Sequence, residues 1–185
     1  MKAMKNKLLY FIFFYLVILF ITPNGYYSFL PVLNVYPTNT KEVNLVIDAV
    51  KNRNIHDIAF FQKTDPSVTH AFVDEVDMEI ADLNTIITSL NPVCFLIKSL
   101  INRARPYQID PSIDILDSKT GSTPSYPAGH AFQAYYLAKV LKKKYPEKAN
   151  VFDTLAKKCD DVRVKAGIHY PSDGEFAKRL VNILY

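Results

Sequence analysis

The sequence lacks several features that would assign a function directly. It holds no cluster of His, Cys, Asp and Glu at metal-ligand spacing, so neither a metal ion nor another cofactor is expected. It has little charge of one sign. The formal net charge is +4, and Lys2, Lys5 and Lys7 supply three of these charges, which leaves +1 for the remainder. The chain is therefore not expected to bind nucleic acid.

The chain also lacks internal repeats, low-complexity segments and any clear strand pattern. Its 185 residues are 49% hydrophobic and 22% charged, which is ordinary for a globular protein and argues against disorder. This length suffices for one domain with a sizeable core. Apolar residues recur at intervals of three and four, which predicts an all-α domain, a single bundle of about six to eight helices.

One long apolar run is present, and it follows the N-terminal lysines. Leu8–Ile21 contains fourteen apolar or aromatic residues. As a helix it would span roughly 21 Å, short of the roughly 30 Å core of a bilayer. Residues 1–25 are therefore predicted to be a signal peptide or an N-terminal anchor, and 26–185 an exported domain that is periplasmic, lumenal or secreted. Residues 22–25 have no Ala-x-Ala pattern, which leaves cleavage open, and no later segment matches the length of a membrane span.

Two cysteines, Cys94 and Cys159, remain ambiguous. In an exported protein they could form a disulfide, and they could equally be two buried thiols that act as small apolar residues. Each lies four residues before a candidate phosphate ligand, Lys98 or Arg163, so convergence of the ligands would bring the cysteines together as well.

The predicted elements follow from caps, prolines and helical spacing. Asn39 and Glu42 resemble a capping box, and Asp65 with Pro66 resembles a strong helix start. The predicted order is a helix from 39 to about 52, a short segment at 58–61, a helix from about 66 to 91, a helix from 93 that ends before Pro106, a loop over 107–125, and helices that begin at 129, about 151 and 171.

The candidate chemistry lies mainly between residues 163 and 173. Arg163 is a permanently charged planar donor that suits an oxyanion. His169 can act as a nucleophile or carry a proton near neutral pH. Asp173, four residues later, can hold one ring nitrogen of His169 and so fix its tautomer.

Two earlier stretches supply what this one lacks. Lys98 and Arg105 are seven residues apart, so two helical turns would place both side chains on one face. Gly129 allows close approach of the backbone, and the helix that begins at Gly129 and His130 directs N–H groups at an anion. Phosphoryl transfer needs cations around the oxygens, an in-line nucleophile and a proton for the leaving group. The conjunction predicts a site of this kind.

Taken singly, each motif has an ordinary structural interpretation. Lys98 and Arg105 could line a solvated helix edge, and the segment before His130 could be a turn. Arg103 and Lys165 are interpreted as solubilising charges. The lysine run at 142–144 is interpreted in the same way, as solubilising charge. His56 and His70 are interpreted as solvated or hydrogen-bonded side chains.

The three stretches together resemble the type-2 phosphatidic acid phosphatase (PAP2) superfamily, which includes bacterial non-specific acid phosphatases and vanadium haloperoxidases. The resemblance covers Lys98 to Asp173, in the order Lys-x6-Arg-Pro, Pro-x-Gly-His and Arg-x5-His-x3-Asp. Two positions depart from the family pattern. Ala128 stands where the family has serine, which removes one hydroxyl contact to phosphate worth about 1 kcal/mol unless Ser122 or Ser125 replaces it. Val162 also replaces a serine.

The resemblance implies a helical bundle with the site among helix ends, and a role for each candidate residue. His169 would attack phosphorus and form a phosphohistidine, Asp173 would orient His169, and His130 would protonate the leaving alcohol and then activate water. The implied phosphate ligands are Lys98, Arg105, Arg163 and the N–H of Gly129, with no metal ion.

The implied activity is that of a soluble acid phosphatase acting on phosphomonoesters of broad type. An N-terminal tether near a bilayer keeps lipid phosphates open as substrates. Two alternatives also stay open: a vanadium haloperoxidase, which shares the anion pocket, and a non-catalytic phosphate-binding domain, which the changes at Ala128 and Val162 would suit.

Overall fold

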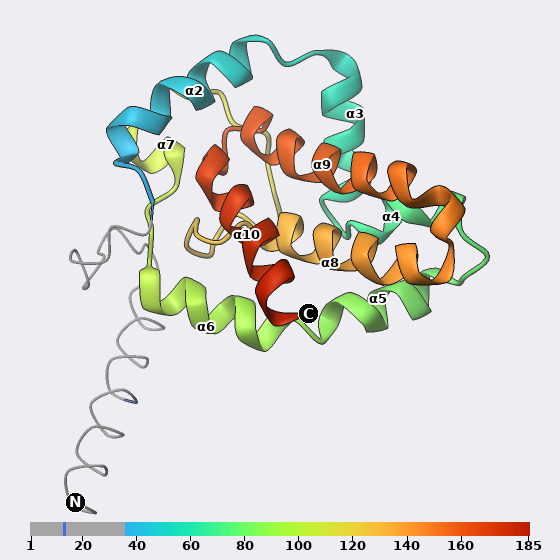
Figure 1. The fold of residues 1–185 in the computed structure, drawn as a ribbon. Helices are drawn as coiled ribbons and strands as arrows, with labels where there is room; N and C mark the ends of the chain where they lie inside the picture. Colours follow the sequence, from blue (N-terminus) through green and yellow to red (C-terminus); the bar gives the residue numbers. More distant parts are fainter. Residues whose placement is uncertain (1–12, 14–35) are drawn as a thin grey trace, which may run out of the picture.

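The computed structural model describes residue 13 and residues 36–185, and these residues contain helices and loops but no strand. The all-α prediction is therefore confirmed (Figure 1). The predicted leader, residues 1–25, lies outside the described residues except for Phe13. The elements in order are α2 (Asn39–Lys51), α3 (Ile55–Thr64), α4 (Thr69–Phe72), η1 (Val73–Glu75), α5 (Ile80–Thr88), α6 (Asn91–Ile101), α7 (Pro106–Ile109), α8 (Gly129–Lys144), η2 (Pro146–Lys148), α9 (Ala149–Lys165) and α10 (Pro171–Leu184).

Helices α8 and α9 form the centre of the fold and are joined by the short turn η2 (Figure 1). Their contact is lined by small residues, Ala134 and Ala138 from α8 and Ala156 from α9, which let the two helix backbones approach closely. Phe72 of α4 and Phe152 of α9 stack with ring centroids 6.3 Å apart and close one end of this core. The remaining helices are arranged around this pair.

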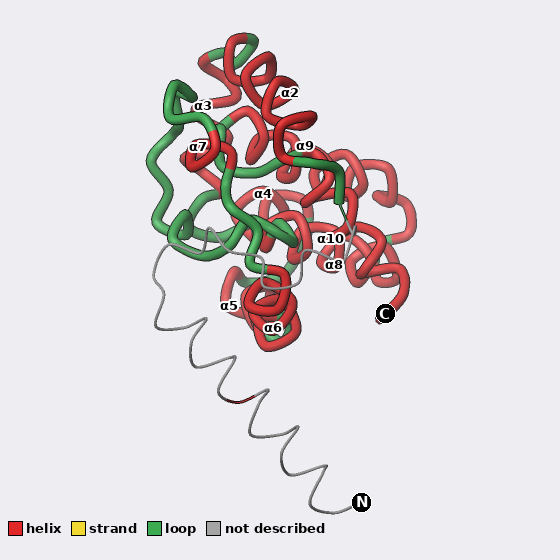
Figure 2. The backbone as a smooth tube through the Cα atoms, turned by 90° about the vertical axis from the view of Figure 1, so that its left-hand side faces the viewer, coloured by secondary structure: helices red, strands yellow, loops and turns green. Residues whose placement is uncertain are grey.

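The other helices cover α8 and α9 from two sides. Helices α6 and α10 pack on α8 through a cluster that includes Cys94, Phe132 and Ala177. Helix α3 packs on α9 through Phe61 and Val162, and α2 lies nearby at the upper edge of Figure 1. Figure 2 shows that long loop segments gather on one side of this helical framework. The candidate site residues lie where those loops meet the helix ends.

The single helix predicted from about residue 66 to 91 is wrong. The chain instead forms α4, η1 and α5, and Asp65 follows the end of α3, where its N–H donates to Phe61 O. The hydroxyls of Ser67 and Thr69 donate to Asn84 Oδ1 at 2.8 Å and 3.0 Å, so α4 folds back against α5. Polar contacts with Asn84 thus determine the fold of this segment, although Asp65 and Pro66 have the local pattern of a helix start.

The predicted capping box at Asn39 and Glu42 is also wrong. The N-cap of α2 is Thr38, and no side chain caps the helix. Both predicted capping side chains turn inward instead. Asn39 Oδ1 accepts from Arg103 Nε at 2.9 Å, and Glu42 Oε2 accepts from Arg103 Nη2 at 2.7 Å.

Lys98 and Arg105 do not share one helix, which corrects a third prediction. Helix α6 ends at Ile101, and Asn102 adopts the left-handed conformation with φ of 49°. Arg105 is the N-cap residue of α7. The reversal at Asn102, rather than a common helix face, brings the two cations together.

Two further sequence features have a structural outcome. Cys94 and Cys159 are both buried free thiols, in separate hydrophobic clusters. Within the described residues, none of the helices alone combines the length and hydropathy of a membrane span. One bent pair, Ile80–Thr88 with Asn91–Ile109, satisfies that test together, with a bend of 44° between its halves.

Candidate active site

A cavity of about 500 Å³ lies between α6, the start of α8 and the loop over 119–123. Most of the residues singled out in the sequence line it. They are Lys98, Arg105, Gly129, His130 and His169. Asp173 and Arg163 do not line the cavity, but each contacts a residue that does. Asp173 contacts His169, and Arg163 contacts Thr120.

Backbone hydrogen bonds fix the three sequence stretches to one another. Ser125 N donates to Arg103 O at 2.8 Å, which joins the segment before α8 to the segment after α6. Ala128 N donates to Asp173 O at 3.2 Å, which joins the same segment to α10. The cavity wall is therefore built by main-chain contacts as well as by side chains.

His169 is positioned by the turn between α9 and α10. Gly167 follows the C-cap residue of α9 and has φ of +76°, a left-handed conformation that glycine adopts readily. A Cβ at Gly167 would lie 2.8 Å from Ile113 Cγ2, so larger residues are also excluded by space. Pro171 then begins α10, and the buried His169 side chain lies in the short link between the two helices.

His169 and Asp173 form a buried pair. His169 Nδ1 lies 3.1 Å from Asp173 Oδ2, and Tyr170 N donates to the same oxygen at 2.9 Å. The carboxylate can only accept, so Nδ1 carries the proton and Nε2 keeps its lone pair. Nε2 lies 3.4 Å from Arg105 Nη1. The arrangement leaves one imidazole nitrogen available as a nucleophile beside a cation.

The charges around this pair set its protonation. Burial, and then the nearby Arg105, hold the pKa of His169 well below its usual value, so the ring is neutral at physiological pH. The pKa of Asp173 is lowered although burial acts to raise it, because hydrogen bonding to His169 and the charge of Arg103 favour the carboxylate. A neutral imidazole beside an ionised carboxylate is the state that a nucleophilic histidine requires.

Arg103 was interpreted from sequence as a solubilising charge, and this is wrong. Its side chain is fully buried and donates to Asp173 Oδ1 and Glu42 Oε2, each at 2.7 Å. The rings of Tyr36 and Tyr170 lie 4.1 Å and 3.8 Å from the guanidinium carbon. Arg103 therefore connects α2 to the carboxylate that holds His169. Sequence alone could not show this, since Glu42 lies 61 residues from Arg103.

Arg105 and Lys98 are held by backbone carbonyls. Arg105 Nε donates to Thr123 O and Nη1 to Ile168 O, both at 2.8 Å. Lys98 Nζ donates to Pro124 O. Carbonyls anchor both cations, and neither forms a salt bridge with a carboxylate in the described part of the chain. Burial lowers the pKa of Lys98 to about 8 and that of Arg105 to about 10. Two buried cations without a carboxylate in direct contact favour an anionic ligand.

Arg163 is the least satisfied of the candidate ligands. Nη2 donates to Asp65 Oδ1 at 2.8 Å and contacts Thr120 Oγ1 at 3.3 Å, and Thr120 lines the cavity. Nε and Nη1 are buried and have no hydrogen-bond partner among residue 13 and residues 36–185. The Phe61 ring centroid lies 4.7 Å from the guanidinium carbon. Buried unpaired guanidinium donors are unusual, and a phosphate oxygen could satisfy them.

His130 is held at the beginning of α8. Its Nε2 lies 2.9 Å from Asp65 O, and because a carbonyl only accepts, Nε2 carries the proton. Burial and the charge of Arg163 lower the pKa of His130 to about 3. In this arrangement its proton faces a carbonyl, so protonation of a leaving group through Nε2 requires that contact to be exchanged for substrate.

Ser122 and Ser125 are the two residues considered as replacements for the hydroxyl group that Ala128 lacks. Ser125 donates to Asp173 Oδ2 at 2.5 Å and lies 3.4 Å from His169 Nδ1, so its hydroxyl belongs to the His169–Asp173 pair. Ser122 lines the cavity and is exposed. Ser122 is therefore better placed than Ser125 to supply the hydroxyl that Ala128 lacks.

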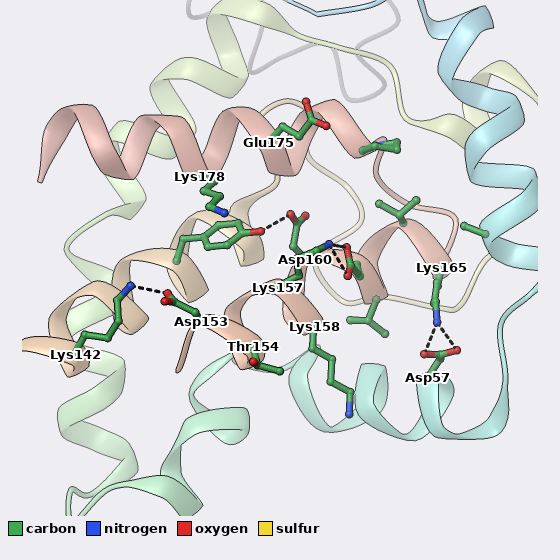
Figure 3. Close-up of a pocket in the computed structure, with 16 residues that line it drawn as sticks. Asp57, Lys142, Asp153, Thr154, Lys157, Lys158, Asp160, Lys165, Glu175 and Lys178 are labelled. Carbon is green, nitrogen blue, oxygen red and sulfur yellow. Dashed lines mark hydrogen bonds and ion pairs between the residues drawn. The ribbon is translucent and has the colours of Figure 1, made fainter. Parts of the chain in front are cut away.

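A second hollow, of about 1240 Å³, lies over α9 and holds none of the predicted site residues (Figure 3). Its charged side chains largely neutralise each other. Lys142 pairs with Asp153, Lys157 with Asp161 and Lys165 with Asp57. The pairing of Lys165 with the largely buried Asp57 replaces its interpretation as a purely solubilising charge. In the part of the chain that the structure describes, no group of three His, Cys, Asp or Glu residues could hold a metal ion.

Comparisons with known proteins bear on the fold. Neither a family model nor a curated protein sequence matches the chain. Among solved structures, the fold is similar to that of a transmembrane PAP2 type phosphatidylglycerolphosphate phosphatase from Bacillus subtilis. The TM-score is 0.54 at 17% identity, over 91% of this chain and 90% of that one. At this identity the likeness concerns the fold, and it is the helical PAP2 fold that the motifs predicted.

Proposed function

We propose that this protein is a metal-independent phosphatase that hydrolyses phosphate monoesters through a phosphohistidine on His169. One observation carries the proposal: a neutral imidazole, oriented by a buried carboxylate, lies beside two buried cations in a cavity of about 500 Å³. The fold similarity to a PAP2 type phosphatase supports the same class of reaction.

The chemistry follows from the groups around the cavity. Lys98, Arg105 and Arg163 would bind the phosphoryl oxygens, together with backbone N–H groups in the first turn of α8, which a helix start leaves without a partner inside the helix. His169 Nε2 would attack phosphorus while the ester oxygen leaves with a proton from His130. Because His130 is neutral in the free site, it would first take up a proton as the negatively charged phosphoryl group binds and raises its pKa, and it would return to the neutral form on giving that proton to the leaving oxygen. Water, activated by His130, would then cleave the phosphorus–nitrogen bond and release inorganic phosphate. Release of phosphate frees His169, and His130 takes from water a proton to replace the one that it gave to the leaving group. Both residues are then ready for another turnover.

We favour a lipid phosphate over a soluble phosphomonoester as the substrate. The cavity lining combines polar residues, such as Lys119, Ser122 and Thr123, with apolar residues that include Ile87 and Phe95. Such a lining suits a phosphate joined to an apolar group. The solved structure with a similar fold acts on phosphatidylglycerolphosphate, and residues 1–25 would tether the domain of 26–185 to a membrane outside the cytoplasm.

A turnover assay tests the proposal. Phosphate release is measured on phosphatidylglycerolphosphate and phosphatidic acid in vesicles, and on soluble alkyl and nitrophenyl phosphates, in the presence of EDTA. Hydrolysis should persist with chelator and should be inhibited by vanadate, which fills the same anion site. His169→Ala should abolish it, whereas the exposed His56→Ala should not.

Three other outcomes of these assays would contradict the proposed mechanism or indicate a different function. Activity lost in EDTA and restored by a divalent cation would contradict the mechanism. Phosphate binding without turnover on any substrate would indicate a binding domain, and bromide oxidation after addition of vanadate would indicate a haloperoxidase.

A further inference from the structure

The outward face of α6 is apolar and carries no charge. Phe95 and Leu96 are 47% and 49% exposed, and Pro92 beside them is also exposed. Lys98 is the helix's single charged residue, and it is buried in the candidate site. The inward face is apolar as well, through the residues that pack on α8 and α10: Leu90, Val93, Cys94 and Ile97.

This pattern distinguishes α6 from the other described helices of comparable length. A surface helix in water ordinarily carries polar and charged residues on its outer face, and a helix that is apolar all round is covered by protein or by lipid. Every other described helix of nine residues or more exposes at least one charged side chain, for example Lys41 in α2, Lys63 in α3, Asp82 in α5, Lys143 in α8, Lys157 in α9 and Glu175 in α10.

The position of α6 beside the cavity limits which kind of partner could cover the outer face of this helix. Helix α6 lies at the lower edge of the molecule in both views (Figures 1 and 2). Phe95 belongs both to the exposed face and to the cavity lining, and Lys98 lines the cavity one turn away. A partner on the outer face of α6 therefore reaches the cavity at Phe95.

We propose that the outer face of α6, formed by Pro92, Phe95 and Leu96, docks into the interfacial layer of a lipid bilayer. Its lack of charge suits acyl chains rather than a protein surface with a polar rim. The bent pair of α5 with the segment from Asn91 is also the part of the described chain with the length and hydropathy of a membrane span. Lipid phosphates would then enter the cavity from the bilayer, past Phe95.

The proposal rests on the proposed function only in its choice of substrate, and docking can be measured without catalysis. The chain has no tryptophan, so one introduced residue is a unique fluorophore. Leu96→Trp reports on α6. Leu45→Trp is the matched control, because Leu45 is 53% exposed and belongs to α2, a helix at the opposite edge of the fold from α6 (Figure 1).

The experiment uses the full-length chain and vesicles of phosphatidylcholine with phosphatidylglycerol. On addition of vesicles, the Leu96→Trp emission should shift to shorter wavelength and be quenched by phosphatidylcholine with brominated acyl chains. Leu45→Trp should show neither effect, even if residues 1–25 tether both proteins to the vesicles. Equal responses of the two variants would overturn the proposal.

Two other occupants of this face give different results. Emission that is already shifted without vesicles, at every protein concentration, would mean that residues of this chain cover α6. A shift that grows with protein concentration in the absence of lipid would mean that a second copy covers it. Either result would replace the bilayer as the partner.

Activity provides an independent readout. Leu96→Asp should lower hydrolysis of a vesicle-embedded lipid phosphate by at least tenfold while leaving hydrolysis of nitrophenyl phosphate unchanged, since Leu96 does not line the cavity. Leu45→Asp should affect neither substrate. If neither substrate is hydrolysed by the unmodified protein, the proposed function fails while the fluorescence result still stands. Equal loss on both substrates in Leu96→Asp would contradict docking.

Discussion

Arg103 Nη1 lies 2.7 Å from Asp173 Oδ1, and both side chains are completely buried. The other oxygen of Asp173 lies 3.1 Å from His169 Nδ1. The carboxylate is therefore held between a permanent cation and the imidazole. Arg103 itself is also bound by Glu42, whose Oε1 accepts from Ser172 N at 2.9 Å and so ties α2 to the first turn of α10.

Replacement of Arg103 should affect both stability and chemistry. Arg103→Gln leaves Asp173 and Glu42 as buried carboxylates without their cation, which should cost about 3–5 kcal/mol in the free energy of unfolding. Because the charge of Arg103 lowers the pKa of Asp173, that pKa should rise in the variant, and the acidic limb of the pH–rate profile should move to higher pH. Urea unfolding and kcat/KM against pH measure the two effects.

A merely structural role for Arg103 would leave the pH profile in place. The exposed Arg179→Gln on α10 is the control and should alter neither quantity. A destabilised Arg103→Gln protein with an unchanged acidic limb would show that Arg103 does not act on the pair of Asp173 and His169.

The helices nearest the chemistry were predictable because their signals are local. Gly129 begins α8, Gly167 follows α9, and Pro171 begins α10, each at the place that caps and prolines indicate. The spacing of four between His169 and Asp173 likewise indicates that the two side chains can meet, although His169 lies in the link before α10 and only Asp173 lies on that helix. Local conformational preference decides these features, so the sequence carries them.

Features that depend on distant partners were not predictable. Asp65 looks like a helix start, but its carboxylate accepts from Arg163, 98 residues away. Arg103 resembles any surface arginine until the fold brings Glu42 and Asp173 to it. A charged residue's burial depends on whether the fold supplies a counter-charge, and no local pattern reports that.

The two histidines should respond differently to the leaving group. His130→Ala should lose the roughly 10²–10⁴-fold typical of general acid catalysis on an alkyl phosphate, whose alkoxide leaves poorly without a proton. On a nitrophenyl phosphate the first step should lose much less, and phosphoenzyme should accumulate because water lacks its base. His169→Ala should abolish turnover of both substrates. Single-turnover kinetics with an assay for acid-labile phosphoenzyme measures each step.

The contact of His130 with Asp65 O makes this test informative. If that contact persists during catalysis, the proton on Nε2 never reaches the leaving group, and His130→Ala would slow both substrates equally. Phosphoenzyme that still forms in His169→Ala would exclude His169 as the nucleophile.

Loss of the Lys98 charge should limit activity at high pH. Burial lowers the pKa of Lys98 to about 8, so the side chain is charged below that pH and becomes neutral above it. If Lys98 binds the phosphoryl group as proposed, kcat/KM should fall as the pH rises through about 8. Lys98→Arg should remove that limb, because a guanidinium stays charged. The comparison variant is Lys119→Arg, an exposed lysine of the same cavity, which should leave the limb unchanged.

Asp160 lies away from this chemistry, on the face of α9 that meets α10. Tyr135 Oη donates to Asp160 Oδ2 at 2.9 Å (Figure 3). A Cβ added at Gly174 would lie 1.8 Å from Asp160 Oδ1, so the carboxyl group occupies the space that any larger residue would need. Burial raises the pKa of Asp160 to about 7. The fold therefore carries a carboxyl group that gains its charge near neutral pH.

The charge of Asp160 should make the protein less stable as pH rises. Between about pH 4 and pH 7 the folded state holds a proton on Asp160 that the unfolded state has released, so the free energy of unfolding falls across this window. Asp160→Asn keeps an acceptor for Tyr135 and removes the titration. It should match the parent protein near pH 4 and exceed its stability by the order of 1–3 kcal/mol at pH 8. Urea unfolding at both pH values measures the difference, with the exposed Asp48→Asn on α2 as the control. An Asp160→Asn effect of the same size at both pH values would mean that Asp160 is ionised throughout, and that Gly174 is tolerated beside a charge rather than beside a neutral acid.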